Sequence, residues 1–144
     1  HHLREAKILN LAGKMWEVTD YLNRVGLVAE PPALSESYTY HMPCHPGWTP
    51  TVDDAPRILL RSIPGSELVE MEDPGKCCGA GGTFFMDFKE LATDIRSRKL
   101  ADIRQTGAQT VLTQCPACRS FLRTQLNDSQ VTHPIVLLAK AYGL

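Results

Sequence analysis

Five cysteines are the residues of this chain best suited to chemistry, and they are grouped rather than scattered. They form a single residue, an adjacent pair and a CxxC unit: Cys44, Cys77-Cys78, and Cys115 with Cys118. Thirty-two residues separate the single cysteine from the pair, and thirty-six separate the pair from the CxxC unit. Thiolates are soft ligands that select zinc, copper(I) or iron–sulfur units over hard cations. The spacing predicts one pocket that collects all five sulfurs.

The number of thiols bears on which metal they would hold. A structural zinc site takes four ligands, usually from two CxxC units, whereas this chain offers five thiols and one such unit. Adjacent residues in extended backbone direct their side chains differently, so Cys77 and Cys78 reach one small ion with difficulty but can ligate different irons. The pattern favours a polynuclear iron–sulfur site, and zinc stays open as the alternative.

Glycines follow the cysteine pair and have a use of their own. Gly79 and Gly81 remove bulk and allow positive φ, which lets backbone amides approach a cluster and bond to its sulfurs. Lys76 and Arg119 place positive charge beside the thiols, where they would lower the thiol pKa values. Ordinary solvated surface charge explains these two side chains equally well.

Other polar and aromatic residues near the cysteines have simpler explanations. His45 could be a sixth ligand, but a polar turn residue is the better interpretation, because five sulfurs suffice. We expect His41 to be a packed or hydrogen-bonded side chain, and His133 to start a helix before Pro134. Trp48 either shields a cluster from solvent or packs a loop. No Ser-His-Asp arrangement or carboxylate pair stands out, so no catalytic residue is assigned.

Composition limits the class of protein. The chain has 144 residues and a net charge of −1, which suits one soluble domain and gives no basic excess for nucleic acid. Its longest apolar stretch, Pro134–Ala139, is too short to span a bilayer, and the N-terminus lacks a secretory signal. A CxxC unit outside the secretory route indicates metal binding or redox activity. We therefore expect a cytoplasmic protein in a reducing compartment.

Apolar periodicity divides the chain into alternating helices and strands. Helices are predicted over Leu3–Val25, Asp54–Ser62, Asp87–Gln105, the residues after Cys118, and Pro134–Ala141. Strands are predicted over Ser37–Met42, Leu68–Met71 and Thr110–Gln114. Gly26 ends the first helix, and the apolar residues on or near one face of the third are Phe88, Leu91, Ile95 and Ile103.

This alternation predicts an α/β fold with a mainly parallel sheet covered by helices. Cys44 and Cys115 would then follow directly on strand ends, so the cysteine-bearing loops gather at the C-terminal edge of the strands, where open α/β sheets bind ligands. Residues 1–36 are expected to form an amphipathic helix and an irregular link that pack on a cysteine-rich domain at 37–144.

The motifs resemble those of a known family. Pro43-Cys44-His45, Cys77-Cys78-Gly79-Ala80-Gly81-Gly82 and Cys115-Pro116-Ala117-Cys118 are similar to the cysteine-rich CCG domain of heterodisulfide reductases and of 2-hydroxyacid oxidase iron–sulfur subunits. The resemblance implies an α/β domain in which the five matching cysteines hold a [4Fe-4S] cluster, noncubane or related, although some copies bind zinc. Such proteins usually carry two copies, so this chain is expected to be part of a longer subunit.

The resemblance also implies a function. Ile63-Pro64-Gly65 with Glu67–Met71 looks most like the C-terminal copy in glycolate oxidase and lactate-utilisation subunits. That likeness implies an electron-transfer domain served by a flavin-dependent dehydrogenase subunit and further iron–sulfur domains, reaching a membrane only through the complex. Disulfide reduction at the cluster, as in heterodisulfide reductase, and a non-enzymatic zinc-stabilised interaction domain are the alternatives.

Overall fold

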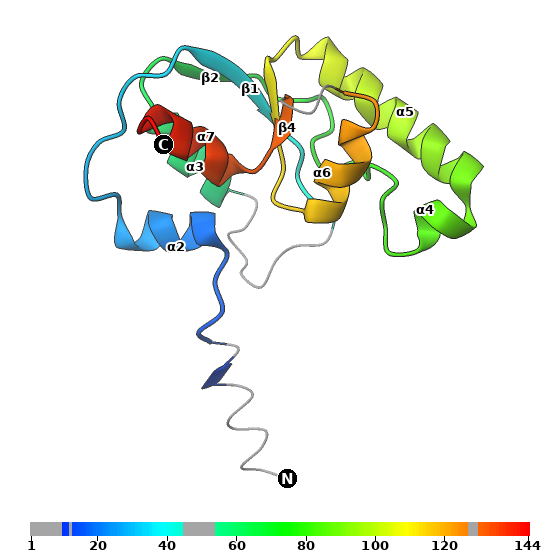
Figure 1. The fold of residues 1–144 in the computed structure, drawn as a ribbon, viewed down its shortest axis with the longest axis horizontal. Helices are drawn as coiled ribbons and strands as arrows, with labels where there is room; N and C mark the ends of the chain where they lie inside the picture. The colour runs from blue at the N-terminus through cyan, green and yellow to red at the C-terminus, as the bar shows by residue number, and fades with distance from the viewer. Residues whose placement is uncertain (1–9, 12, 45–53, 127–129) are drawn as a thin grey trace.

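Four parallel strands form one sheet in the part of the chain that the computed structural model describes, which is residues 10–11, 13–44, 54–126 and 130–144. The strands are β1 (Glu36–Tyr40), β2 (Ser66–Leu68), β3 (Thr110–Leu112) and β4 (Val131–Thr132). Their spatial order is β2-β1-β3-β4, and every neighbouring pair is parallel (Figure 1). The prediction of an α/β fold with a parallel sheet is confirmed.

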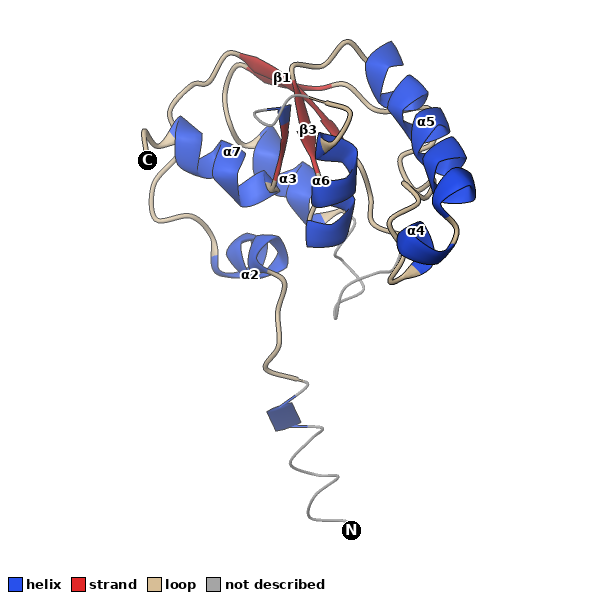
Figure 2. Ribbon diagram, turned by 45° about the vertical axis from the view of Figure 1, so that its right-hand side comes forward, coloured by secondary structure: helices blue, strands red, loops and turns tan. Residues whose placement is uncertain are grey.

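Helices cover both faces of this sheet (Figures 1 and 2). On one face, α3 (Ala55–Arg61) and α7 (Pro134–Ala141) pack against the tyrosines of β1, with α2 (Val18–Val25) outside them. On the other face lie α5 (Lys89–Gln105) and α6 (Pro116–Arg123), and the short α4 (Phe84–Asp87) precedes α5. Val111 and Leu112 are neighbours on β3 and belong to opposite cores, as the two-residue period of a strand requires.

The last helix begins where the sequence predicts. His133 is its N-cap, and the His133 Nδ1 atom accepts a hydrogen bond from the Ile135 amide at 3.2 Å. Pro134 occupies the first turn, where its missing N–H costs nothing. Capping thus explains His133, as expected.

The long N-terminal helix is the main error of the sequence analysis. The structure interrupts the predicted span: residues 10–11 are helical, Gly13 and Lys14 form a turn, and α2 begins at Val18 with Glu17 at the N-cap. Glycine inside a helix costs about 1 kcal/mol relative to alanine, and the exposed Leu11, Met15 and Trp16 supply little packing to offset it. Residues 1–9 and 12 lie outside the described part. Gly26 does end the helix, with φ +81°.

Helix α5 differs from its prediction in its start and in its buried side. The chain breaks at Phe88, so α5 begins at Lys89 rather than at Asp87. Phe88 and Leu91 are exposed, and the residues that α5 buries are Ala92, Lys99, Leu100 and Ile103. The pattern of apolar residues did not predict the buried side of α5, because this side contains Lys99.

Smaller differences arise at strand and helix ends. Strand β2 begins to pair with β1 at Ser66 instead of Leu68. A tight turn, in which the Ser66 amide donates to the Ile63 carbonyl, brings the chain next to β1 at this point. Strand β3 ends at Leu112, short of the predicted Gln114. Helix α6 begins at Pro116, before Cys118. Strand β4 and helix α4 have no counterpart in the sequence prediction.

The buried lysine of α5 ties this helix to the loop that precedes the cysteine pair. Lys99 is fully buried, and its Nζ donates to the Asp73 carbonyl at 2.6 Å and to the Asp102 carboxylate at 3.1 Å. The same carboxylate accepts from the Glu72 amide at 3.0 Å. Lys99 and Asp102 therefore fix residues 72–73, five or fewer positions before Cys77.

We expect Lys99→Met to lower the free energy of unfolding by about 3 kcal/mol, because it strands a largely buried carboxylate and a carbonyl. Arg98→Met on the same helix is the matched control, since Arg98 forms only an exposed ion pair with Asp94 and should change stability by less than about 0.5 kcal/mol. Urea unfolding followed by circular dichroism measures both. Equal losses in the two variants would contradict the role given to Lys99.

The His133 cap predicts a pH dependence of stability. Burial, with a smaller contribution from Arg119, lowers the pKa of His133 in the folded protein below its usual 6.5. The unfolded chain then binds a proton that the folded chain does not, so this contribution is complete above about pH 6.5 and is lost as the pH falls below it. His133→Asn keeps an acceptor at every pH. Unfolding at pH 7.5 and 5.5 should show a smaller loss in the variant than in the wild type; identical losses would refute the assignment.

Candidate metal centre

Three buried side chains from three segments meet on the α5/α6 side of the sheet. They are His41, Cys78 and Cys118, and their ligand atoms all lie within 4.8 Å of one another. His41 follows β1, Cys78 follows the loop held by Lys99, and Cys118 lies in the first turn of α6. Figure 1 shows the chain leaving β1 close to the start of α6. This is the arrangement expected when parallel strands end at one edge of a sheet.

The remaining cysteines extend this group on both sides. The Cys44 thiol hydrogen-bonds to Cys77, and Cys115 lies beside Cys118. We call these five sulfurs the sulfur row. Its direct pairs are Cys44 with Cys77, Cys78 with Cys118, and Cys118 with Cys115, and the Cys44 and Cys78 thiols also interact through their charges. Cys44 is exposed and Cys77 is partly buried, whereas the other three are buried. Each cysteine thus lies near another one, and a single pocket that collects all five sulfurs stays a prediction.

The CxxC unit is positioned by the start of α6. Cys115 is the N-cap of this helix, and its sulfur accepts the Cys118 amide at 3.5 Å. The Cys115 amide in turn donates to the Thr113 hydroxyl at 3.4 Å. A helix N-terminus favours negative charge, so this end of α6 suits thiolate ligands.

Gly79 shapes the turn at the cysteine pair. Its φ is +88°, and a Cβ atom there would lie 2.6 Å from the Ala92 carbonyl oxygen of α5. Its amide donates to the Cys77 sulfur at 3.3 Å, and the Ala80 amide bonds to the Cys78 sulfur. The expected approach of backbone amides to sulfur is therefore seen at Gly79 and Ala80. Gly81 has open space around it.

Hydrogen bonding polarises the buried thiols. The Cys118 thiol donates to Cys78, which lowers the pKa of Cys78 to about 4 against the opposing effect of burial; His41 and the Ala80 amide act in the same direction. The same bond, burial and Cys115 raise the pKa of Cys118. Burial, with Cys77 and Cys78, raises the pKa of Cys44. Among these cysteines, Cys78 is thus the one whose thiol is ionised most readily.

Of the two basic residues beside the cysteines, Arg119 joins two elements and Lys76 is exposed. Arg119 Nε donates to the Val131 carbonyl at 3.3 Å, which joins α6 to β4. His45 and Trp48 lie outside the described residues.

His41 is the site residue that the sequence analysis missed. Strand alternation contains the signal, because Tyr38 and Tyr40 face the α3/α7 core and the next odd position must face the cysteines. His41 is fully buried, and neither ring nitrogen bonds to an oxygen or nitrogen of the described residues. It is packed, as expected, but it is packed against thiols.

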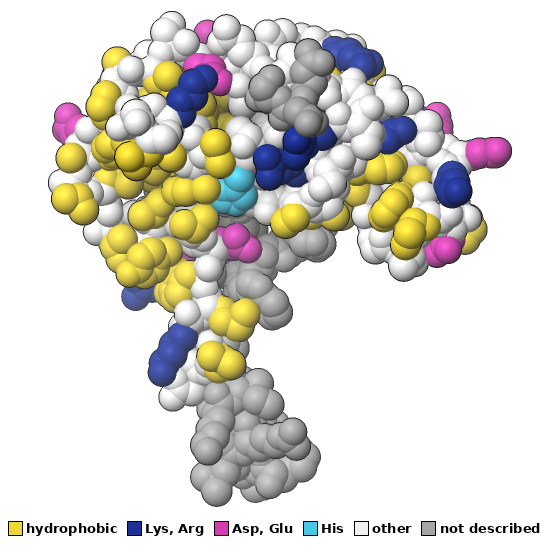
Figure 3. Space-filling view, in the orientation of Figure 1, with side chains coloured by type: hydrophobic (Ala, Val, Ile, Leu, Met, Phe, Trp, Pro, Cys, Tyr) yellow, Lys and Arg dark blue, Asp and Glu magenta, His cyan; other side chains and the backbone are white. Residues whose placement is uncertain are grey.

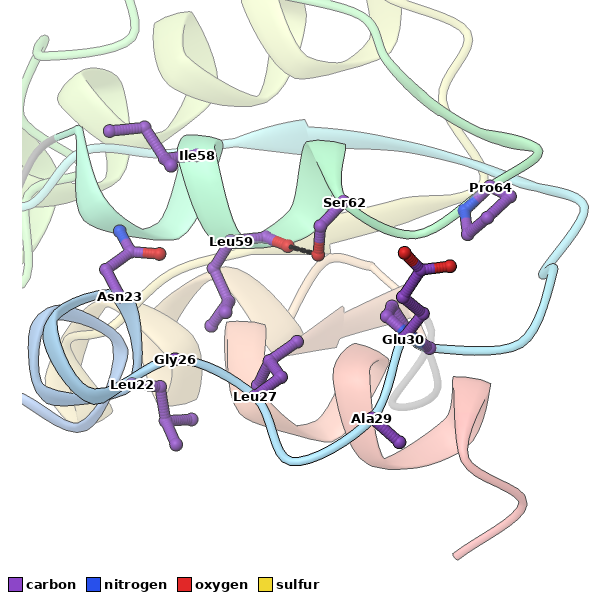
Figure 4. A pocket seen from close by; sticks show the side chains of 11 residues that line it. Leu22, Asn23, Gly26, Leu27, Ala29, Glu30, Ile58, Leu59, Ser62 and Pro64 are labelled. Atoms are coloured by element: carbon purple, nitrogen blue, oxygen red, sulfur yellow. Dashed lines mark hydrogen bonds between the residues drawn. The ribbon is translucent and has the colours of Figure 1, made fainter.

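A pocket distant from the cysteines offers less chemistry. It holds about 470 Å³ between α2, the link after it and α3, and its lining is mainly apolar, with Glu30 as its one ionisable side chain (Figure 4). In Figure 3, hydrophobic side chains gather on the face that carries α7 and α2, where Tyr21, Val25 and Val136 are exposed. Among the described residues, no helix is long and apolar enough to cross a membrane.

The contact at Gly79 gives a prediction for the site. Gly79→Ala should lower the free energy of unfolding by about 2–4 kcal/mol, because it combines an unfavourable φ with a clash against fixed backbone. Gly81→Ala is the matched control and should change stability little, since nothing lies near its Cβ position. Denaturant unfolding of the two variants under reducing conditions makes the comparison. A control that loses as much as Gly79→Ala would show that the contact with Ala92 is not the cause.

Comparison with known proteins adds to this geometry. Residues 38–123 match the model of the cysteine-rich domain family CCG. The chain is 40% identical to an uncharacterised iron–sulfur protein of Methanococcus maripaludis over 83% of its length. It is 37% identical over 78% of its length to one component of the dihydromethanophenazine:CoB–CoM heterodisulfide reductase of Methanosarcina acetivorans. It is 33% identical to lactate utilization protein A of Bacillus licheniformis over 74%.

These relatives are longer proteins, of which the chain covers 24%, 29% and 45% respectively. The segment of this chain that matches the family model runs from β1 to α6 and holds all five cysteines. A match that spans more than half of the chain, together with the converging thiols, shows that this protein belongs to the cysteine-rich CCG domain family of iron–sulfur proteins.

Proposed function

We propose that this domain holds a [4Fe-4S] cluster, noncubane or related, on Cys44, Cys77, Cys78, Cys115 and Cys118, and transfers electrons within an oxidoreductase complex. The observation that carries the proposal is that each of the five cysteines interacts with another one, and that three of them are buried. An iron–sulfur group is supported by a relative that is described as an iron–sulfur protein.

The donor set fits a polynuclear group better than a single ion. Tetrahedral zinc takes four ligands, and the row supplies a fifth sulfur. Cys77 and Cys78 also turn to different partners, Cys44 on one side and Cys118 on the other. Two adjacent thiols that face opposite ways favour ligation of separate metal centres.

The bound cluster would supply a one-electron store, and the chain's own residues would tune it. Buried Cys78, Cys115 and Cys118 keep water from one end. The amides of Gly79 and Ala80 donate to the sulfurs of the pair, and Gly81 leaves room beside them. Hydrogen bonds to the sulfurs and exclusion of solvent are among the main ways in which a protein sets the reduction potential of a cluster.

The electron donor we propose is a flavin-dependent 2-hydroxyacid dehydrogenase subunit acting on glycolate or lactate, with further iron–sulfur domains leading to the acceptor. The similarity to lactate utilization protein A supports this choice. A complex of this kind would work in the cytoplasm, where reducing conditions keep the thiols free to bind metal.

Anaerobic reconstitution with iron and sulfide tests the cluster. The wild type should become brown and hold about four irons per chain, with an EPR signal in one oxidation state. Each of the five cysteine-to-serine variants should lose iron, sulfide or the native signal, whereas Ser120→Ala, on the exposed side of α6, should match the wild type. A colourless protein with stoichiometric zinc would replace this proposal with the zinc domain, and unchanged iron in every cysteine variant would remove the ligand assignment.

A second candidate function is disulfide reduction at the same site. It is favoured by the exposed position of Cys44 at one end of the row, which gives a substrate access, and by the similarity to a heterodisulfide reductase subunit. The donor subunit of the complex would pass two electrons, one at a time, through the cluster, and with two protons from solvent these would convert the disulfide into two thiols. A heterodisulfide that changes the EPR signal of the loaded wild type supports this function, and an unchanged signal argues for electron transfer alone.

A further inference from the structure

His41 has no part in the proposed function, yet it lies at the centre of the sulfur row. Its side chain is fully buried, and one of its ring nitrogens lies within 4.8 Å of the sulfurs of Cys78 and Cys118. Its backbone amide donates to the Leu112 carbonyl at 2.8 Å, which extends the pairing of β1 with β3 by one bond. The imidazole is therefore held against the thiols by the sheet itself.

The imidazole must find its polar partner among these sulfurs. A neutral imidazole carries one N–H donor and one acceptor nitrogen, and leaving such groups unpaired in a protein interior costs about 1–3 kcal/mol each. Within the described residues, neither ring nitrogen has a hydrogen-bond partner of regular geometry. The Cys78 sulfur is the natural acceptor for the ring N–H, because it lies within 4.8 Å of the ring and interacts with His41.

Donation to sulfur suits the site better than ligation to a metal. Five thiols already exceed what a four-coordinate ion requires, so a nitrogen ligand is not needed to complete the set. A hydrogen bond to a ligand sulfur stabilises negative charge, and it stabilises the reduced state of a cluster more than the oxidised state because the reduced state is more negative. The expected effect is a higher reduction potential.

We propose that His41 is a positioning residue that donates a ring N–H hydrogen bond to the Cys78 sulfur and thereby raises the reduction potential of the bound cluster. The effect on potential rests on the proposed function. The hydrogen bond itself does not, because it joins two residues of this chain.

The hydrogen bond can be tested in reduced, metal-free protein. Histidine-labelled ¹⁵N spectra of the wild type should show one ring N–H that exchanges slowly with water, and this signal should vanish in His41→Gln. Rapid exchange of every ring N–H in the folded wild type would overturn the proposal. This measurement stands even if no cluster assembles, an outcome that would remove the proposed function alone.

The potential is tested in loaded wild type, His41→Gln and His41→Leu, by redox titration followed by EPR. The glutamine amide retains a donor and the leucine does not, so His41→Leu should keep its iron but shift to a more negative potential, with His41→Gln closer to the wild type. His133→Asn is the control, since the His133 ring accepts the Ile135 amide as the cap of α7, and the potential of this variant should match that of the wild type.

Two results would overturn this part of the inference. One is the same potential in all three proteins, which would make His41 a packing residue. The other is loss of iron in both His41 variants, together with nitrogen hyperfine coupling in the wild type, which would make it a metal ligand. If His41→Leu fails to fold, the exchange rate of the ring N–H in the wild type decides whether the hydrogen bond exists.

Discussion

The parallel pairing of β1 with β3 is the constraint on which the rest of the structure depends. Tyr38 pairs with Thr110 and Tyr40 with Leu112, so both strands run toward the same edge and end almost level. Four residues beyond β1 the chain reaches Cys44, and three residues beyond β3 it reaches Cys115. An antiparallel pair would place these thiols at opposite ends of the sheet.

The third set of thiols reaches this edge by a different route, because Cys77 lies nine residues beyond β2. Two contacts with α5 replace the strand as its support. Lys99 and Asp102 hold the loop before the pair, and the Gly79 backbone lies against the Ala92 carbonyl behind it. Since Cys78, Cys115 and Cys118 also belong to the α5/α6 core, the proposed metal binding and the folding of this core would involve the same residues.

The sequence predicted the structure well where capping or apolar periodicity alone determines an element. The His133-Pro134 start of α7, the strand rhythm and the cysteine-bearing strand ends follow from capping, periodicity and topology, and the structure agrees with each. The sequence predicted less well where contacts between distant elements determine which residues are buried or helical. The buried side of α5 depends on an ion pair that makes Lys99 a core residue. The interruption of the predicted N-terminal helix before Val18 follows from a lack of packing, because Leu11, Met15 and Trp16 are exposed. The approach of His41 to the thiols could have been read from β1 alternation once the cysteine face was known.

The order of burial along the sulfur row has a consequence for how the metal-free protein meets oxidants and alkylating reagents. Such reagents attack thiolates, and they need access. Cys44 is exposed but has a raised pKa, whereas Cys78 has the lowered pKa but is buried. Accessibility and nucleophilicity therefore reside in different residues, so a metal-free form of this protein would react slowly with such reagents at neutral pH.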